Sequence, residues 1–270
     1  MSLPIAFCER MRTLLGSTEY EAFLAALSAP RAHSLRRNPI HCTAEHFPAQ
    51  DRFSLTPVPW CPEGFYYPAE ERPGKHPYYE AGLYYIQEPS AMAVGALARP
   101  QKDEWVLDLC AAPGGKTSHV APYAGFVLAN EIHPARAKIL SQTVERMGLT
   151  NTVVTNETPA RLAARFPEAF DCVIVDAPCS GEGMFRKDED ATGEWNADSP
   201  ALCAARQDEI LEEAAKMVRP GGRIVYSTCT FAPEENEGTL TRFLSRHPAF
   251  DLPEQTDVPW FASGQPDWYP

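Results

Sequence analysis

The sequence of 270 residues lacks the features that define several classes of protein. No apolar run approaches the roughly 20 residues that a helix needs to span a bilayer, so we expect no contact with a membrane. The first ten residues show no basic segment followed by an apolar core, so we expect no secretory signal there. There is also no internal repeat and no low-complexity tract, and 44% of the residues are hydrophobic. These features together indicate a globular chain with a sizeable core.

Closely spaced cysteines are also lacking. The eight cysteines lie far apart, and no Cys-x-x-Cys pair occurs. This spacing argues against a disulfide framework and a zinc ribbon, and it predicts a reducing compartment, the cytoplasm. Cys42 and Cys61 lie near His41 and His46, but their spacing fits no standard zinc pattern. We therefore predict no metal site.

Positive charge is scarce as well. The chain has 24 Lys and Arg against 36 Asp and Glu, a net charge of −12, whereas nucleic-acid binding usually leaves a basic footprint. The imbalance is uneven, because residues 1–100 carry 9 basic and 10 acidic side chains, and residues 101–270 carry 15 and 26. The first segment is therefore the better candidate for a basic surface.

The first hundred residues predict a small α+β domain, to which we assign residues 1–97. Apolar residues recur at helical spacing from Pro4 to Leu27, with a turn near Ser17 that divides two helices. Residues 34–40 predict a short strand. Residues 53–85 are rich in proline and aromatics, which is typical of short strands and ordered loops rather than of a linker.

After Pro100 strands alternate with helices, which predicts an α/β fold with a doubly wound, Rossmann-like parallel sheet over residues 98–270. The expected strands are 105–109, 126–131, 151–155, 170–176 and 222–228, and the expected helices start at Lys116 and cover 135–147 and 204–218.

A glycine-rich turn follows the first of these strands, in the string from Asp108 to Thr117. Small residues there allow a ligand to approach the backbone, at the edge of the sheet where nucleotide-like ligands bind. A tight turn without a ligand is the alternative interpretation. Glu131 ends the next strand, where an acid commonly holds ribose hydroxyls, although a solvated loop acid is the simpler explanation.

Two cysteines follow the fourth and fifth strands, Cys179 in Asp176–Gly183 and Cys229 in Ser227–Thr230. A lone cysteine is more often a small buried hydrophobe than a nucleophile. Adjacent strands would place these two thiols at one edge of the sheet, beside the glycine-rich turn, which favours nucleophilic chemistry.

These motifs, followed by Pro233–Glu237, resemble the Nol/Nop/Sun family of RNA cytosine-5 methyltransferases. Residues 72–77 and 84–92 resemble the bacterial RsmF-like branch of that family, which acts on small-subunit ribosomal RNA. The resemblance covers nearly the whole chain. It implies an S-adenosylmethionine-dependent methyltransferase fold in residues 98–270 and an RNA-binding role for residues 1–97.

The resemblance also implies the roles of individual residues. Cys229 matches the family's nucleophile, and Cys179 matches a second cysteine that assists proton removal or product release. Asp176 matches the acid near the cofactor and target base, and Lys116 matches a lysine of the active site. The residues implied in cofactor binding are Cys110, Ala111, Ala112, Pro113, Gly114, Gly115, Lys116, Glu131, Arg136 and Asp176.

The implied chemistry needs a thiolate, because carbon 5 of cytosine is too poor a nucleophile to accept a methyl group directly. Addition of Cys229 to carbon 6 would activate carbon 5, and the base would be flipped out of its stack to reach the site. The expected partner is RNA, either free small-subunit ribosomal RNA or the assembled subunit. The alternatives are a methyltransferase for a non-RNA substrate and a truncated RNA-binding module that binds cofactor without turnover.

The sequence departs from the family pattern in two places. Thr158 stands at or near the position where relatives often have an adenine-contacting Asp, with Asn156 and Glu157 as substitutes. Relatives also continue beyond the present C-terminus with a final strand, so we expect a truncated chain. Among surface residues, Arg186 and Lys187 are the better candidates for a phosphate contact. Arg36 and Arg37 could also contact phosphate, but we expect them on a solvated face. The tyrosines at 66, 67, 78, 79, 84 and 85 are expected mainly to pack in the core or loops.

Overall fold

The computed structural model describes residues 3–187, 189–253 and 259–269. Contacts between residues divide the chain into two compact units. The sheet unit comprises residues 32–176 and 213–226, and the helical unit comprises residues 1–31, 177–212 and 227–270. Among the described residues no helix is both long and apolar enough to cross a membrane.

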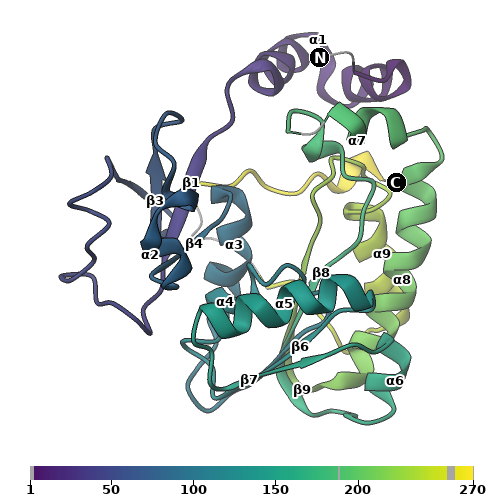
Figure 1. Cartoon of the computed structure of the whole chain (residues 1–270). Coiled ribbons are helices and arrows are strands. Elements are labelled where there is room, and N and C mark those ends of the chain that lie inside the picture. The colour runs from purple at the N-terminus through teal and green to yellow at the C-terminus, as the bar shows by residue number, and fades with distance from the viewer. Residues whose placement is uncertain (1–2, 188, 254–258, 270) are drawn as a thin grey trace. The chain divides into compact units, whose positions relative to one another are not determined.

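The sheet unit contains a five-stranded sheet with the order β7-β6-β5-β8-β9 (Figure 1). The pairs β5–β6, β5–β8 and β6–β7 are parallel, as the alternation of strands and helices in the sequence predicts. The strands are β5 (Trp105–Asp108), β6 (Phe126–Asn130), β7 (Thr152–Thr155), β8 (Phe170–Asp176) and β9 (Val218–Ser227).

In the sheet unit α3 (Pro89–Ala98) precedes β5, and α4 (Thr117–Val120), α5 (Pro134–Arg146) and α6 (Pro159–Ala163) follow β5, β6 and β7 in turn. A proline stands in the first turn of α3, α5 and α6, where its missing N–H costs no helical hydrogen bond. Gly148, with φ +67°, follows α5 and supplies the left-handed conformation that ends many helices.

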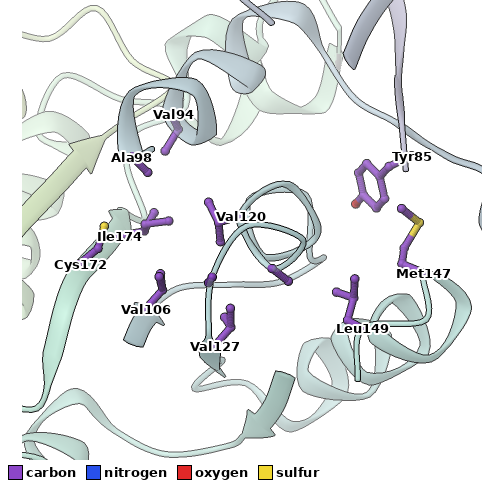
Figure 2. Close-up of a cluster of buried hydrophobic side chains, with 12 residues drawn as sticks. Tyr85, Val94, Ala98, Val106, Val120, Val127, Met147, Leu149, Cys172 and Ile174 are labelled. Carbon is purple, nitrogen blue, oxygen red and sulfur yellow. The ribbon is translucent and has the colours of Figure 1, made fainter. Parts of the chain in front are cut away.

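The core of the sheet unit lies where the central strands meet α3 and α4. Val106, Val127 and Ile174 come from three neighbouring strands and pack with Val94 of α3 and Val120 of α4 (Figure 2). The first three and Val120 are fully buried. The strands that contribute to this core are apolar, as buried parallel strands usually are. Burial of their side chains, more than the intrinsic strand propensity of the residues, therefore stabilises the sheet.

A second, antiparallel sheet in the same unit has the order β2-β3-β1-β4. Leu35, Phe47, Phe53 and Tyr84 form its separate core. The sheet consists of β1 (His33–Arg37), β2 (Thr56–Val58), β3 (Cys61–Tyr67) and β4 (Tyr84–Ile86), with η1 (Pro73–Lys75) and α2 (Pro77–Glu80) before β4.

The helical unit is built around the N-terminal helix α1 (Ile5–Ser28), which is broken at Gly16 with φ +71°. This break agrees with the predicted turn near Ser17. Phe7 packs edge to face on Phe185 with the ring centroids 5.1 Å apart. The other elements are η2 (Glu182–Met184), α7 (Glu189–Glu194), α8 (Ser199–Met217), α9 (Glu237–Arg246) and η3 (Pro266–Trp268), and α8 and β9 continue across the boundary between the units.

Several boundaries differ from the sequence prediction. Helix α8 begins at Ser199 instead of Ala204, and β9 begins at Val218, before the glycine pair at 221–222. The helix predicted from Lys116 is short and ends at Val120. The domain boundary predicted near residue 97 stays a prediction.

The expectation that Arg36 and Arg37 lie on a solvated face is wrong. Their exposed fractions are 1% and 7%, because both side chains find buried hydrogen-bond acceptors. Tyr84 and Tyr85 are buried as well, which agrees with packing in the core.

Candidate active site

The glycine-rich turn between β5 and α4 is braced by α5. The peptide before Pro113 is cis, and Gly114 has φ +108°, a conformation that favours glycine. A Cβ atom on Gly114 would lie 2.7 Å from Cγ2 of Thr143, so glycine is also required by the close approach of α5. The hydroxyl of Thr143 donates to the carbonyl of Pro113 at 2.8 Å. The turn is therefore fixed from one side by the helix that follows β6.

A buried carboxylate lies under this turn. Asp108 ends β5 with no exposed surface, and its Oδ2 accepts a hydrogen bond from Thr117 Oγ1 at 2.6 Å. Burial raises the pKa of Asp108 to about 6, against the opposing effect of the Thr117 bond. Its Oδ1 atom is buried and has no partner among the described residues. An orphaned acceptor at this position fits a turn that is completed by a ligand or water.

Lys116 and Asp176 form an ion pair at the same end of the sheet. Lys116 Nζ donates to Asp176 Oδ2 at 2.5 Å, and both side chains are partly exposed. Asp176 ends β8, the strand next to β5, which explains how residues 60 positions apart in the sequence meet. The structure thus brings together two of the four predicted catalytic residues. Cys110, between β5 and the turn, is partly buried, and burial raises its pKa to about 12.

Glu131 follows β6 and is held by its neighbours. The backbone N–H of His133 donates to Glu131 Oε1 at 3.0 Å, and Arg136 NH2 lies 3.5 Å from Oε2. Arg136 also donates to the carbonyl of Ala112 at 2.9 Å, which links the acid to the glycine-rich turn. Ile132, half exposed beside Glu131, is an apolar surface residue that the sequence analysis did not single out.

The three residues proposed near the adenine position have structural partners. Thr158 Oγ1 accepts from the backbone of Arg161 and caps α6, and Glu157 pairs with the Arg161 side chain at 2.7 Å. Asn156 donates to the carbonyls of Glu131 and Ile132 at 2.6 and 2.9 Å. Asn156 therefore supports the segment that carries Glu131, a role that needs the N–H groups of an amide rather than a carboxylate.

In the helical unit the two predicted cysteines lie in direct contact. Cys179 Sγ and Cys229 Sγ are 3.2 Å apart, and the backbone N–H of Cys229 lies 3.3 Å from Cys179 Sγ. Cys229 is exposed and Cys179 is half-buried. The hydrogen bond with Cys229 and burial raise the pKa of the Cys179 thiol well above its ordinary value. Cys179 therefore keeps its proton, and Cys229 is the more accessible sulfur.

A buried clamp holds the cysteine loops together. Glu235 Oε2 accepts from the backbone N–H of Ser180 at 3.0 Å and from Gln207 Nε2 at 2.8 Å. Gln207 also donates to the carbonyl of Pro178, so both neighbours of Cys179 are fixed. Asn236 accepts from Thr228, the residue before Cys229, at 2.7 Å. From the sequence, Glu235 and Asn236 are expected only as part of the family motif Pro233–Glu237, and no pattern singles out Gln207.

Glu182 connects the same loops to α1. Its carboxylate has no exposed surface and accepts from Arg10 at 2.5 Å, from Trp195 Nε1 at 3.1 Å and from the backbone of Phe231 at 3.2 Å. Glu182 lies three residues after Cys179 and Phe231 lies two after Cys229, so one carboxylate ties both loops to the N-terminal helix. Arg186 and Lys187 follow this segment and are partly buried, and their contact with phosphate stays a prediction.

The cysteines and histidines considered for a metal do not come together as a set. His41 and His46 are exposed, whereas Cys61 lies with Glu63 and His119 within 4.8 Å. Burial, and then the Arg36 charge, hold the pKa of His119 well below its usual value, and Nδ1 of this ring has no partner among the described residues. Cys61 Sγ and His119 Nε2 lie 3.7 Å apart, within hydrogen-bond distance for sulfur, and the expectation that the chain holds no metal stays a prediction.

The parallel sheet and the glycine-rich turn after β5 define the broad class of this protein. Doubly wound parallel sheets with a ligand turn after the first strand are typical of nucleotide- and cofactor-binding α/β proteins. Residues 95–263 match the family model described as 16S rRNA methyltransferase RsmB/F, and residues 3–89 match the N-terminal domain of 16S rRNA methyltransferase RsmF. The chain belongs to the RsmB/F family of methyltransferases, as the resemblance predicts.

Curated relatives carry the name ribosomal RNA small subunit methyltransferase F. Those of Klebsiella pneumoniae (strain 342) and Escherichia coli O139:H28 are 40% and 39% identical over 258 residues, which is 91% of this chain and 54% of each relative. The chain thus spans about half the length of the curated relatives it matches.

Solved structures share the fold. The crystal structure of PH0851 is 29% identical with a TM-score of 0.84, covering 91% of this chain and 57% of that chain. A methyltransferase homolog protein from Pyrococcus horikoshii is 27% identical with a TM-score of 0.73, covering 90% and 83%. The predicted Rossmann-like methyltransferase fold with a small α+β part is confirmed.

Proposed function

We propose that the chain transfers a methyl group from S-adenosylmethionine to carbon 5 of a cytosine in small-subunit ribosomal RNA, through a covalent bond between Cys229 and carbon 6. The observation that carries this proposal is the contact of Cys179 and Cys229 at 3.2 Å. Methyl transfer to nitrogen or oxygen needs no thiol, whereas activation of carbon 5 needs a nucleophile. Family membership supports a methyltransferase, and the paired sulfurs favour carbon as the acceptor.

The residues at and beside the turn are proposed to hold S-adenosylmethionine. Glu131 is buried and already held by the N–H of His133 and by Arg136. It is proposed to accept from a ribose hydroxyl, and the half-exposed Ile132 beside it suits a flat adenine ring. We propose that the methionine part lies against the turn from Ala111 to Gly115, in which Pro113 is exposed and the other four residues are buried, with Cys110 and Arg136 as further contacts. When bound, the cofactor supplies an electrophilic methyl group on its sulfonium.

The residues of this chain supply the remaining steps. Cys229 Sγ forms a bond to carbon 6, which makes carbon 5 nucleophilic toward the methyl group. Asp176, paired with Lys116, is proposed to hydrogen-bond the ring at N3 and the amino group and so stabilise the addition. A base, for which solvent water suffices in this scheme, then takes the carbon 5 proton; the electrons of the C–H bond restore the ring double bond, and the carbon 6–Sγ bond breaks with its electrons returning to Cys229.

Cys179 is proposed to assist this last step. Because it keeps its proton next to Cys229, it can donate a hydrogen bond to the returning thiolate and make it a better leaving group. We propose RNA as the partner, either free or in the assembled subunit. The cytoplasmic location predicted from the cysteine spacing goes with this proposal.

The experiment that tests the proposal measures transfer of labelled methyl from S-adenosylmethionine to unmodified small-subunit ribosomal RNA. Wild-type protein should label cytosine, Cys229→Ala should not, and Cys179→Ala should accumulate a protein–RNA adduct. Label on adenine or guanine, or full activity in Cys229→Ala, would overturn the assigned chemistry. Binding of cofactor without transfer to RNA or to the assembled subunit would favour a binding module.

A further inference from the structure

Arg36, in β1, has an exposed fraction of only 1%, which is unusual for an arginine. Burial lowers its pKa to about 10, so it still carries its charge at neutral pH. A buried cation is stable only where hydrogen-bond acceptors of the protein take the place of its hydration water. The acceptors of Arg36 therefore show which part of the chain it fixes in position.

The acceptors lie in the glycine-rich turn and the first turn of α4. NH2 donates to the carbonyl of Gly115 at 3.2 Å and to Ser118 Oγ at 2.8 Å. NH1 donates to the carbonyl of Ser118 at 3.1 Å, while Nε donates to Gln87 Oε1 at 2.8 Å. Three of these four bonds therefore reach residues 115–118, about 80 positions along the chain.

These bonds fix the orientation of a peptide in the proposed cofactor site. A trans peptide is planar with its C=O and N–H on opposite sides, so holding the Gly115 carbonyl toward Arg36 directs the N–H of Lys116 the other way. Lys116 is also the residue whose side chain pairs with Asp176. The guanidinium thus sets both the backbone that faces the ligand and the start of the lysine side chain.

We propose that Arg36 is a positioning residue for cofactor binding, so that β1 of the small sheet supports the cofactor-binding turn of the large sheet. The inference rests on the proposed function, because it takes the turn to be the cofactor site. Arg36 touches no ligand itself and acts through the carbonyls of Gly115 and Ser118.

The adjacent residue provides a matched control. Arg37 is also buried in β1, but side chains alternate across a strand, and its contacts lie elsewhere. Its NH1 donates to the carbonyl of Cys42 at 2.6 Å and its NH2 lies 3.9 Å from Glu63. Replacing either arginine by Gln removes a buried guanidinium from the same strand, but only Arg36→Gln frees residues 115–118.

The test compares the wild type, Arg36→Gln, Arg37→Gln and Ser118→Ala by calorimetric titration with S-adenosylhomocysteine and by thermal unfolding. Both Gln variants should lower Tm. Arg36→Gln should raise Kd at least tenfold, Ser118→Ala about threefold, and Arg37→Gln less than twofold. Ser118→Ala, a small change, keeps the test available if Arg36→Gln does not fold. Amide exchange in the free protein should speed up over residues 114–119 in Arg36→Gln and Ser118→Ala but not in Arg37→Gln.

Two outcomes would overturn the inference while the proposed function stands. One is wild-type binding with an unchanged Kd in the folded Arg36 and Ser118 variants. The other is an equal loss of affinity in both arginine variants, which would reflect general destabilisation. Failure of the wild type to bind S-adenosylhomocysteine would instead reject the proposed cofactor site, and this inference with it.

Discussion

The sulfur atoms of Cys179 and Cys229 lie 3.2 Å apart, and the N–H of Cys229 points to Cys179 Sγ at 3.3 Å. Two thiolates at this separation would repel each other strongly, so the pair retains one proton. The raised pKa of Cys179 assigns that proton to the half-buried sulfur. The exposed Cys229 is then the sulfur that is able to act as a nucleophile.

The first prediction follows from this asymmetry. At pH 8, iodoacetamide should alkylate Cys229 at least tenfold faster than Cys179, because alkylation requires a thiolate and access to it. Peptide mass spectrometry over a time course measures both rates, with the fully buried Cys172 as an unreactive internal control. Equal labelling of Cys179 and Cys229 would contradict the assignment of the proton.

The second prediction concerns the clamp formed by Glu235. Glu235→Ala leaves the N–H of Ser180 and the amide of Gln207 without their buried acceptor, so we expect a loss of about 1–3 kcal/mol in the free energy of unfolding. Methyl transfer should fall at least tenfold, because Cys179 loses its fixed backbone. Denaturant titration and the transfer assay check these values.

Glu234 supplies the matched control, because its Oε2 atom has no hydrogen-bond partner among the residues that the structure describes. Glu234→Ala removes a buried acceptor that makes no hydrogen bond in the described part of the chain, so it should not lower the free energy of unfolding and should leave transfer near the wild-type rate. If both variants behave alike, Glu235 does not act through the cysteine loop.

The third prediction uses two glycines. A Cβ on Gly183 would lie 2.9 Å from the carbonyl oxygen of Cys229, and backbone cannot move away cheaply, whereas a Cβ on Gly193 would meet nothing within 4 Å. Gly183→Ala should therefore displace Cys229 and reduce methyl transfer about tenfold or more, an estimate based on the cost of small misplacements in active sites. Gly193→Ala should retain the wild-type rate. Comparable rates for the two variants would show that Cys229 tolerates the displacement.

The fourth prediction is a pH dependence from Asp108. Its pKa is raised from 3.8 to about 6 by burial, so folding favours the protonated form. This contribution to stability is present below pH 4 and is lost as pH rises through 6, by about 3 kcal/mol for two pKa units. Asp108→Asn keeps a partner for Thr117 and removes the ionisation.

The measurement is denaturant unfolding of wild type and Asp108→Asn between pH 4 and pH 7. The stability of the variant relative to wild type should increase across this range. A constant difference between the two proteins would show that Asp108 titrates normally and that its burial carries no electrostatic cost.

The sequence predicts the pairing of the cysteines because each follows an apolar strand, and neighbouring parallel strands end at one edge of a sheet. The same argument places Lys116 near Asp176. Both relationships depend on β8, the strand Phe170–Asp176, lying between β5 and β9 in the sheet.

Sequence patterns do not predict the buried polar contacts. From the sequence Arg36 and Arg37 are expected on a solvated face because charged side chains are rarely buried, and the acceptors of Arg36 lie 51 to 82 positions away. Gln207 stands on a helix whose spacing gives no sign that its amide reaches Pro178. Contacts of this kind depend on packing between distant segments, which local periodicity does not record.

The most direct test of the central claim is the formation of a covalent adduct between the protein and small-subunit ribosomal RNA transcribed with 5-fluorocytidine. With fluorine in place of hydrogen, the methylated carbon 5 has no proton to lose. Elimination is therefore blocked, and the bond between Cys229 and carbon 6 should persist. With S-adenosylmethionine present, denaturing electrophoresis and peptide mass spectrometry should show RNA attached to Cys229 in the wild type and no adduct in Cys229→Ala. An adduct on Cys179, or one that survives in Cys229→Ala, would contradict the account.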